Sequence, residues 1–448
     1  MGIINFAKKM SKVDLKKSKS YIAFIGVTAA FMLNAINISY NEYIYGSRDI
    51  VEKSVNNVGN VVQGGTEFFD LRPVLFQKQN IFMLLLVVII FSTFCNLYYI
   101  QKKKKEMAFC LINGASLIDL TKYLLWVNGV NYIAGTLLGL VLGIILIPAF
   151  NFFMYSLSGV QGNLFSFSID TIGITFAFIF IQFVCLVALG FGSTYRHQLI
   201  DLIKGQKTVT IKDNRTVKVP GLLFFILYLL PIFYGIKAKG SQGDDIALYY
   251  LGFVGLVGIL GTISYFIPKL INKIKDKTFM YKGARRIYVS NFMYSLHNAK
   301  MYFFGLGFSL LYFAYTIERY SYRPGVLQNG IFCFVGSSLI IGLTLAYKLS
   351  VEIEEKKVLY KQLKILGYTR EEISDAINKE YILFFGIGLL MPFLIILVTI
   401  LTYIKLGTFT ISFAVAIFAS YTIPLALGGI IATVSNKRKI LNWIYGGM

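Results

Sequence analysis

Long apolar runs constrain the fold of this 448-residue chain more than any other feature. Apolar residues make up 56% of the chain and charged residues only 15%, whereas a soluble domain carries about 25% charged residues. A helix needs about 20 residues to cross the hydrocarbon core of a bilayer. Windows close to that length predict an all-α integral membrane protein with ten transmembrane helices, at 21–39, 80–100, 124–150, 171–193, 220–236, 247–268, 301–317, 330–347, 381–403 and 411–434.

Basic residues predict how these spans are oriented. Most of the 44 Lys and Arg fall in segments that are cytoplasmic if the N-terminus is inside, which is the positive-inside pattern. We therefore expect a multi-pass protein of the plasma membrane with both termini cytoplasmic. The first 20 residues precede a full-length span without a small-residue cleavage pattern, so we expect them to be retained. The net charge of +22 then needs no nucleic-acid partner to explain it.

Two cytoplasmic segments between spans share one pattern. They read KKKKEMAFCLINGASLID (102–119) and EEKKVLYKQLKILGYTREE (354–372). A basic cluster beside a single span would indicate only a topological anchor. The two segments share more than their charge, however, and this favours a structural element that occurs twice in the chain.

In each segment a charged helix is expected to end at a glycine, Gly114 or Gly367. Two residues later a hydroxyl side chain, Ser116 or Thr369, is followed at the third position by a carboxylate, which is the spacing of a capping box. The sequence therefore predicts two rigid elbows between membrane spans. The leucines of the second elbow alternate with lysines at helical spacing, so this helix could also lie on membrane lipids, and the two interpretations are compatible.

The flanking sequence predicts an internal duplication. A basic lateral helix, a span, an outer loop, a span, the elbow and two more spans occur in that order in each half, and two extra spans separate the halves. The predicted organisation is a first half at 1–206 with its elbow at 102–119, a linker with two spans at 207–281, and a second half at 282–448 with its elbow at 354–372.

The sequence contains few candidate catalytic, metal-binding or ion-binding groups. No ionisable residue lies inside any predicted span, and the polar exceptions are Asn128, Asn131 and Gln182. Ion-coupled secondary transporters generally need charged or densely polar groups at membrane depth, so that class is disfavoured. The four cysteines and two histidines lack metal-binding spacing, and no GxxxxGK[ST] loop is present. We expect no enzyme activity, metal or cofactor in this chain, and energy for transport must come from another polypeptide.

The first elbow carries a resemblance to a known family. KKKKEMAFCLINGAS followed by LIDLTKYLLW resembles the cytoplasmic signature of FtsX-like permeases, in which a basic cluster and a glutamate, here Glu106, precede an apolar helix ending in Gly-Ala-Ser. Four spans, two connecting spans and four spans is the layout of BceB-type permeases, which are membrane subunits of ABC exporters that protect Gram-positive bacteria from antimicrobial peptides. Two features depart from that pattern. The outer connection at 317–329 is short where BceB-type proteins carry a large extracellular domain, and Leu359 stands where the second elbow would match Glu106.

The resemblance implies a function. It implies a permease that exports or removes an amphipathic substrate, such as an antimicrobial peptide or a lipid, with two copies of a separate ABC ATPase that binds ATP and Mg²⁺. A sensor histidine kinase often accompanies such complexes, and the missing outer domain leaves room for another membrane subunit. The alternative is an FtsX-like signalling or mechanotransmission scaffold that moves no substrate. The resemblance places the ATPase-coupling residues at Glu106, Phe109, Leu111, Gly114, Ala115 and Ser116 in the first elbow, and at Leu359, Leu363, Leu366, Gly367 and Thr369 in the second.

Overall fold

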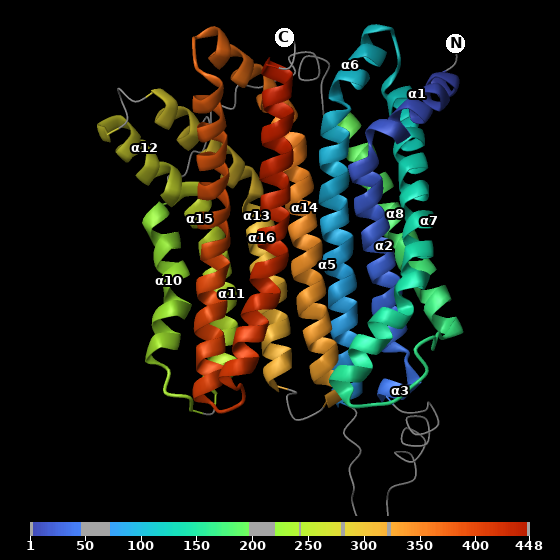
Figure 1. The fold of residues 1–448 in the computed structure, drawn as a ribbon, viewed down its shortest axis with the longest axis vertical. Helices are drawn as coiled ribbons and strands as arrows, with labels where there is room; N and C mark the ends of the chain where they lie inside the picture. Colours follow the sequence, from blue (N-terminus) through green and yellow to red (C-terminus); the bar gives the residue numbers. More distant parts are fainter. Residues whose placement is uncertain are drawn as a thin grey trace, which may run out of the picture. The chain divides into compact units, whose positions relative to one another are not determined.

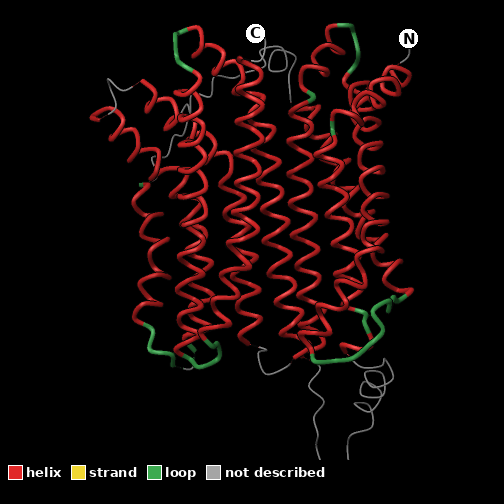
Figure 2. The backbone as a smooth tube through the Cα atoms, viewed as in Figure 1, coloured by secondary structure: helices red, strands yellow, loops and turns green. Residues whose placement is uncertain are grey.

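The described part of the chain is built from helices and loops (Figures 1 and 2). The computed structural model describes residues 3–45, 72–196, 220–241, 243–278, 283–319 and 324–445. Within these ranges no strand occurs, which confirms the predicted all-α class. The predicted linker at 207–219 and most of the first outer loop lie outside the described residues.

Eight of the described helices are long and apolar enough to cross a membrane, as expected for a multi-pass membrane protein. The candidate spans are Lys19–Ser39, Gln79–Lys102, Leu117–Leu157, Ile169–Leu189, Asp244–Ile274, Leu327–Ile353, Arg370–Lys405 and Ile411–Tyr445. One face of Leu117–Leu157 presents Ile133, Leu137, Val141 and Ile144 at helical spacing, and each of these side chains is more than half exposed. Such an uncovered aliphatic stripe suits contact with lipid chains.

The other two predicted spans fall in helices outside this group of eight. The span at 220–236 lies in α10 (Gly221–Lys237), which has only 17 residues. The span at 301–317 lies in α13 (Gly283–Arg319), where glycine, serine and tyrosine dilute the apolar residues. A topology of ten spans therefore stays a prediction.

The chain divides into two compact units. The first comprises Met1–Ile100, Phe109–Arg196 and Thr316–Gly336, and the second comprises Gln101–Ala108, His197–Tyr315 and Ser337–Met448. The helices that lie wholly or mostly in the first unit are α1 (Ile3–Lys17), α2 (Lys19–Ser39), α3 (Glu42–Tyr45), α5 (Arg72–Lys102), α7 (Leu117–Ser158) and α8 (Ile169–Arg196), and the division between the units falls within α6 (Lys104–Ile112).

Glycines allow α2 and α7 of the first unit to approach closely. Gly135, Gly139 and Gly143 recur every four residues along α7 and face α2 at Gly26 and Ala30. A Cβ at Gly139 would lie only 2.3 Å from the carbonyl oxygen of Gly26, so any larger residue would collide with backbone. This small-residue stripe is a packing device of membrane helices, because close backbone approach maximises van der Waals contact where lipid removes the hydrophobic driving force.

A buried polar group ties α1 to the spans of the first unit. The Asp14 carboxylate of α1 accepts hydrogen bonds from the Tyr99 hydroxyl and, at 2.8 Å, from Nδ2 of Asn131. Asp14 is only 3% exposed. Asn128 and Gln182, the other polar residues expected inside spans, are also buried, and they bond to Tyr21 and Tyr132 respectively. These polar groups therefore join helices instead of lining an open channel.

The second unit contains the remaining helices. They are α10, α11 (Asp244–Gly261), a π-helical turn η1 (Thr262–Phe266), α12 (Ile267–Thr278), α13, most of α14 (Pro324–Ile365), α15 (Arg370–Lys405) and α16 (Ile411–Tyr445). The basic segment at 285–300 was expected to form a lateral helix before its span. The structure instead continues it into that span as α13, whereas α1 and α2 are separated at Ser18.

Candidate functional site

The first elbow follows α6 (Lys104–Ile112), a short helix that starts after a break at Lys103. Gly114 has a φ of 83°, in the left-handed region that an L side chain rarely adopts. The amide of Ala115 donates to the carbonyl of Cys110 at 3.1 Å, so the carbonyls at the end of α6 are satisfied. The predicted glycine stop is confirmed.

A capping box starts α7 immediately after this turn. The Asp119 amide donates to Oγ of Ser116 at 3.1 Å, and the Ser116 amide donates to Oδ2 of Asp119 at 3.4 Å. Both orphan amides at the start of a 42-residue helix are thereby satisfied. The predicted cap is confirmed, and the elbow turns directly into one long rigid helix.

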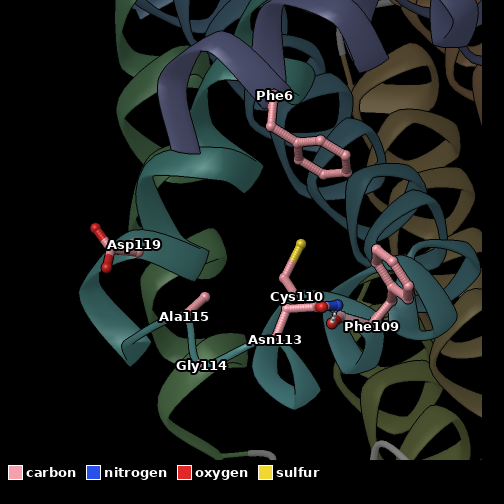
Figure 3. A pocket seen from close by; sticks show the side chains of 7 residues that line it. All are labelled: Phe6, Phe109, Cys110, Asn113, Gly114, Ala115 and Asp119. Atoms are coloured by element: carbon pink, nitrogen blue, oxygen red, sulfur yellow. Dashed lines mark hydrogen bonds between the residues drawn. The ribbon is translucent and has the colours of Figure 1, made fainter. Parts of the chain in front are cut away.

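A cavity of about 360 Å³ lies between this elbow and α1 (Figure 3). It is lined by Phe6, Phe109, Cys110, Asn113, Gly114, Ala115 and Asp119. Asn113 donates from Nδ2 to the carbonyl of Phe109 at 2.7 Å, which holds the turn closed on one side. The lining combines two aromatic rings and small residues with the Asn113 amide and the Asp119 carboxylate, so the cavity suits a largely apolar side chain.

The second elbow repeats the turn and the cap but not the break. Here α14 runs without interruption to Ile365, and Gly367 has a φ of 92°. The Tyr368 amide donates to the carbonyl of Leu363 at 3.1 Å. At the start of α15, the amide of Glu372 donates to the Thr369 hydroxyl at 3.2 Å and the Thr369 amide donates to the Glu372 carboxylate at 2.9 Å. The same stop and cap therefore occur in both elbows.

The predicted site residues differ in accessibility. Phe109 is 60% exposed and Leu366 is 74% exposed, as expected for positions that would meet another protein. Leu363 is only 7% exposed, so its side chain lies in the interior of the second unit. The remaining predicted residues are Glu106, Leu111 and Ala115, which are half-buried, and Gly114, Ser116, Leu359, Gly367 and Thr369, which are exposed.

The C-terminal end of α16 braces the second elbow. The ammonium of Lys357 lies 4.5 Å from the ring centroid of Trp443, and that of Lys364 lies 4.7 Å from the ring of Tyr445. Nζ of Lys364 also donates to the carbonyl of Ile444 at 2.8 Å. These contacts tie the exposed face of the elbow helix to the last turns of the chain.

A cluster of four buried charges stands behind the second elbow, and the sequence analysis missed it. Lys348, Glu352 and Lys356 recur every four residues on α14, and Glu380 of α15 faces them. Nζ of Lys348 lies 2.8 Å from Glu352, Nζ of Lys356 lies 2.9 Å from Glu352, and Lys356 also pairs with Glu380. All four are less than 10% exposed.

Neutral groups complete this cluster. The Ser295 hydroxyl of α13 donates to Glu352, and the Tyr360 hydroxyl donates to Glu380 at 2.9 Å. The predicted spans contain no charged residue, and these four buried charges lie just beyond them. The predicted spans ended one residue before Lys348 and began one residue after Glu380, although the helices continue through both positions. The spacing of four between alternating charges was the available signal.

No metal centre is present in the described part of the chain. No group of three or more His, Cys, Asp or Glu there is placed to hold an ion. The four cysteines form no disulfide in the described part of the chain, and three of them are buried.

Comparison with known proteins supports the class that these features suggest. Residues 80–197 match the family model described as FtsX-like permease C-terminal, a segment that includes the first elbow and the spans on both sides of it. No curated protein matches the chain. The similarity supports an FtsX-like ABC permease and indicates a permease-type membrane protein of an ABC transporter. Permeases of this kind are membrane subunits that generally work with an ABC ATPase and are generally not themselves catalytic.

Proposed function

We propose that this chain is the permease subunit of a BceB-type exporter, driven by two copies of a separate ATPase that dock on the two elbows. The observation that carries the proposal is the repeated geometry of Gly114 with its cap and Gly367 with its cap. In both places a tight turn presents exposed apolar side chains and leads directly into a long capped helix. The first of these turns lies inside the segment that is similar to FtsX-like permeases.

The elbows are suited to transmit force. Closure of an ATPase dimer on ATP and Mg²⁺ would push on each turn, and a capped helix moves with its first turn because its terminal amides are satisfied. Behind the first elbow, α7 is 42 residues long, and behind the second, α15 is 36 residues long. In the first elbow, the cavity beside Phe6 and Phe109 would receive an apolar side chain of the ATPase.

The substrate that best fits these spans is an amphipathic peptide or lipid. The buried charged groups Asp14, Lys356 and Glu380 are held by other side chains, and the outward faces of the spans carry aliphatic side chains. The substrate would therefore move along the lipid-facing side or be released from the outer leaflet. Antimicrobial peptide resistance in a Gram-positive bacterium is the activity that this mechanism would support, with a sensor kinase as an accessory partner.

Substitutions at the two elbow glycines test the coupling. Nothing lies within 4 Å of a Cβ at Gly114 or Gly367, so a side chain there acts through backbone conformation alone. Valine is strained in the left-handed region by roughly 1–2 kcal/mol, whereas asparagine visits it readily. We expect G114V and G367V to lower substrate-stimulated ATP hydrolysis of the purified complex about tenfold, and G114N and G367N to retain it.

Three outcomes of this experiment are informative. Recovery of two ATPase copies per chain, together with loss of transport in the valine variants only, supports the proposal. Transport at the wild-type rate in both valine variants contradicts it. Elbow-dependent ATP hydrolysis without movement of any peptide or lipid would favour the signalling scaffold.

A further inference from the structure

The helix α12 is amphipathic and strongly basic. Its twelve residues, IPKLINKIKDKT, include four lysines and a single acidic residue, Asp276. Ile267, Leu270 and Ile274 are three and four residues apart, so they form one stripe along the helix. Lys269 and Lys273 lie on another face. This pattern is typical of helices that lie at a membrane surface.

Only the start of the apolar stripe is covered by the protein. Ile267 is 8% exposed, but Leu270 is 46% exposed and Ile274 is 43% exposed. Figure 1 shows α12 running obliquely to the long helices of its unit instead of packing along them. Two large aliphatic side chains therefore stand uncovered next to exposed lysines. A water-exposed helix would gain nothing from this arrangement, whereas a helix at a lipid surface would bury the stripe.

The length of the preceding span places α12 at the membrane surface. The helix α11 has 18 residues, and at about 1.5 Å per residue it covers about 27 Å. The hydrocarbon core is about 30 Å thick, so α11 covers most of it, and the π-helical turn η1 follows α11. The candidate span Asp244–Ile274 has 31 residues, which is about 46 Å at the same rise, and is therefore longer than the core. Its last residues belong to α12 and extend beyond the core to the headgroup region.

A polar contact fixes this junction. Nζ of Lys300, on α13, donates to the hydroxyl of Ser264 in η1 at 3.1 Å. The turn is thereby attached to a second helix of the same unit, so the direction in which α12 leaves the span is set by the fold. In Figure 1, α12 lies at the end of this unit where α15 begins, which is the end that carries the second elbow.

We propose that α12 is a binding surface for anionic phospholipid. The stripe of Leu270 and Ile274 enters the boundary between headgroups and acyl chains, and the ammonium groups of Lys269 and Lys273 lie at the phosphates. Charge decides between lipid classes, because four lysines against one aspartate favour an anionic surface over a zwitterionic one. The proposal does not depend on coupling to an ATPase.

Spin labels on the full chain test the depth of α12. Single cysteines at Leu270, Asn272 or Ile274, in a C185S background, would carry a nitroxide label, since the other native cysteines are buried. Nanodiscs of phosphatidylcholine, with or without phosphatidylglycerol, supply the two surfaces. Collision with oxygen reports lipid, and collision with a water-soluble nickel chelate reports solvent. We expect oxygen to dominate at 270 and 274 and nickel at 272, and we expect phosphatidylglycerol to increase the contrast at least twofold.

A charge variant with a matched control isolates the lysines. In K269Q/K273Q the effect of phosphatidylglycerol at position 270 should disappear, and less phosphatidylglycerol should remain bound to the purified protein by native mass spectrometry. In K237Q/K239Q, which removes two exposed lysines at the opposite end of α11, both readouts should stay at wild-type values.

Two results would overturn the proposal. One is equal nickel access at 270 and 272 in both nanodiscs, which would place the stripe in water. The other is shielding of position 270 from both reagents only when a soluble partner is bound, which would make α12 a protein-docking helix.

Discussion

The two units end in similar elbows but differ in what is buried behind them. In the first, the Asp14 carboxylate accepts hydrogen bonds from two neutral donors, the Tyr99 hydroxyl and the Asn131 amide. In the second, two lysines and two glutamates from α14 and α15 form a buried cluster in which the charges balance. The surface geometry is thus repeated while the interior chemistry is not. A capped turn depends on a few local residues, whereas a buried cluster depends on every helix that faces it.

This difference predicts unequal sensitivity to removal of one partner from each buried cluster. Glu380→Ala would leave Lys356 buried with only Glu352 as an anionic partner, and breaking a buried ion pair costs about 3–5 kcal/mol. Asn131→Leu in the first unit removes one neutral donor from Asp14, which costs about 1–3 kcal/mol. We expect Glu380→Ala to lower the melting temperature of the detergent-solubilised protein more than Asn131→Leu does.

A double variant separates charge from packing. Lys356→Met combined with Glu380→Leu removes both partners and replaces them with apolar groups of similar volume, which is often close to neutral. Recovery of most of the stability lost in Glu380→Ala is therefore expected. If the double variant is as unstable as the single one, then shape and not charge balance sets the stability of this cluster.

Gly139 in the first unit and Gly388 in the second face different kinds of neighbour. A Cβ at Gly139 would lie 2.3 Å from the Gly26 carbonyl oxygen, which is fixed backbone, whereas a Cβ at Gly388 would lie 2.2 Å from the ring of Phe303, which can rotate. Overpacking typically costs about 1–3 kcal/mol. We expect Gly139→Ala to fall at the upper end of that range and Gly388→Ala at the lower end, in thermal unfolding.

Gly129→Ala serves as the control for intrinsic helix propensity. No atom lies within 4 Å of a Cβ at this position in α7, so alanine should be neutral or slightly stabilising. A loss of stability in Gly129→Ala as large as that in Gly139→Ala would show that the glycine stripe does not act through contact with α2.

The elbows could be predicted from sequence because their determinants are adjacent. A glycine, a hydroxyl residue two positions later and a carboxylate three further on are sufficient to specify a stop and a cap. The buried cluster could not be predicted in the same way. A hydropathy window ends a predicted span at the first lysine, so Lys348 is assigned to the edge of the membrane. Glu380 becomes a partner of Lys356 only when α15 packs against α14.

The exposure of the leucine side chains in the second elbow also could not be predicted from the sequence. The spacing of Leu363 and Leu366 predicts one helical face and one role, yet Leu363 is buried and Leu366 is exposed. The difference arises because α14 ends at Ile365, so Leu363 lies on the packed helix and Leu366 lies in the turn that follows it. Likewise, the basic segment at 285–300 resembles the basic segment of α1 in sequence. The segment of α1 is separated from its span by a break at Ser18, whereas the segment at 285–300 continues into its span as α13.

The smallest effect that we predict concerns the two tryptophans, one in each unit. Lys357 lies over Trp443 and ties the second elbow helix to α16, whereas Lys8 lies 5.5 Å from the ring centroid of Trp126 and ties α1 to α7. An exposed cation–π contact is worth about 0.5–1 kcal/mol. Trp443→Ala should therefore raise amide hydrogen exchange at 357–368 about two- to fivefold, because local opening becomes easier by that amount. Trp126→Ala should leave exchange in the turn at 113–116 within a factor of about two, since that contact does not involve the first elbow. Equal loosening of both elbows by both variants would mean that the tryptophans act on overall stability, and the brace on the second elbow would then have no local role.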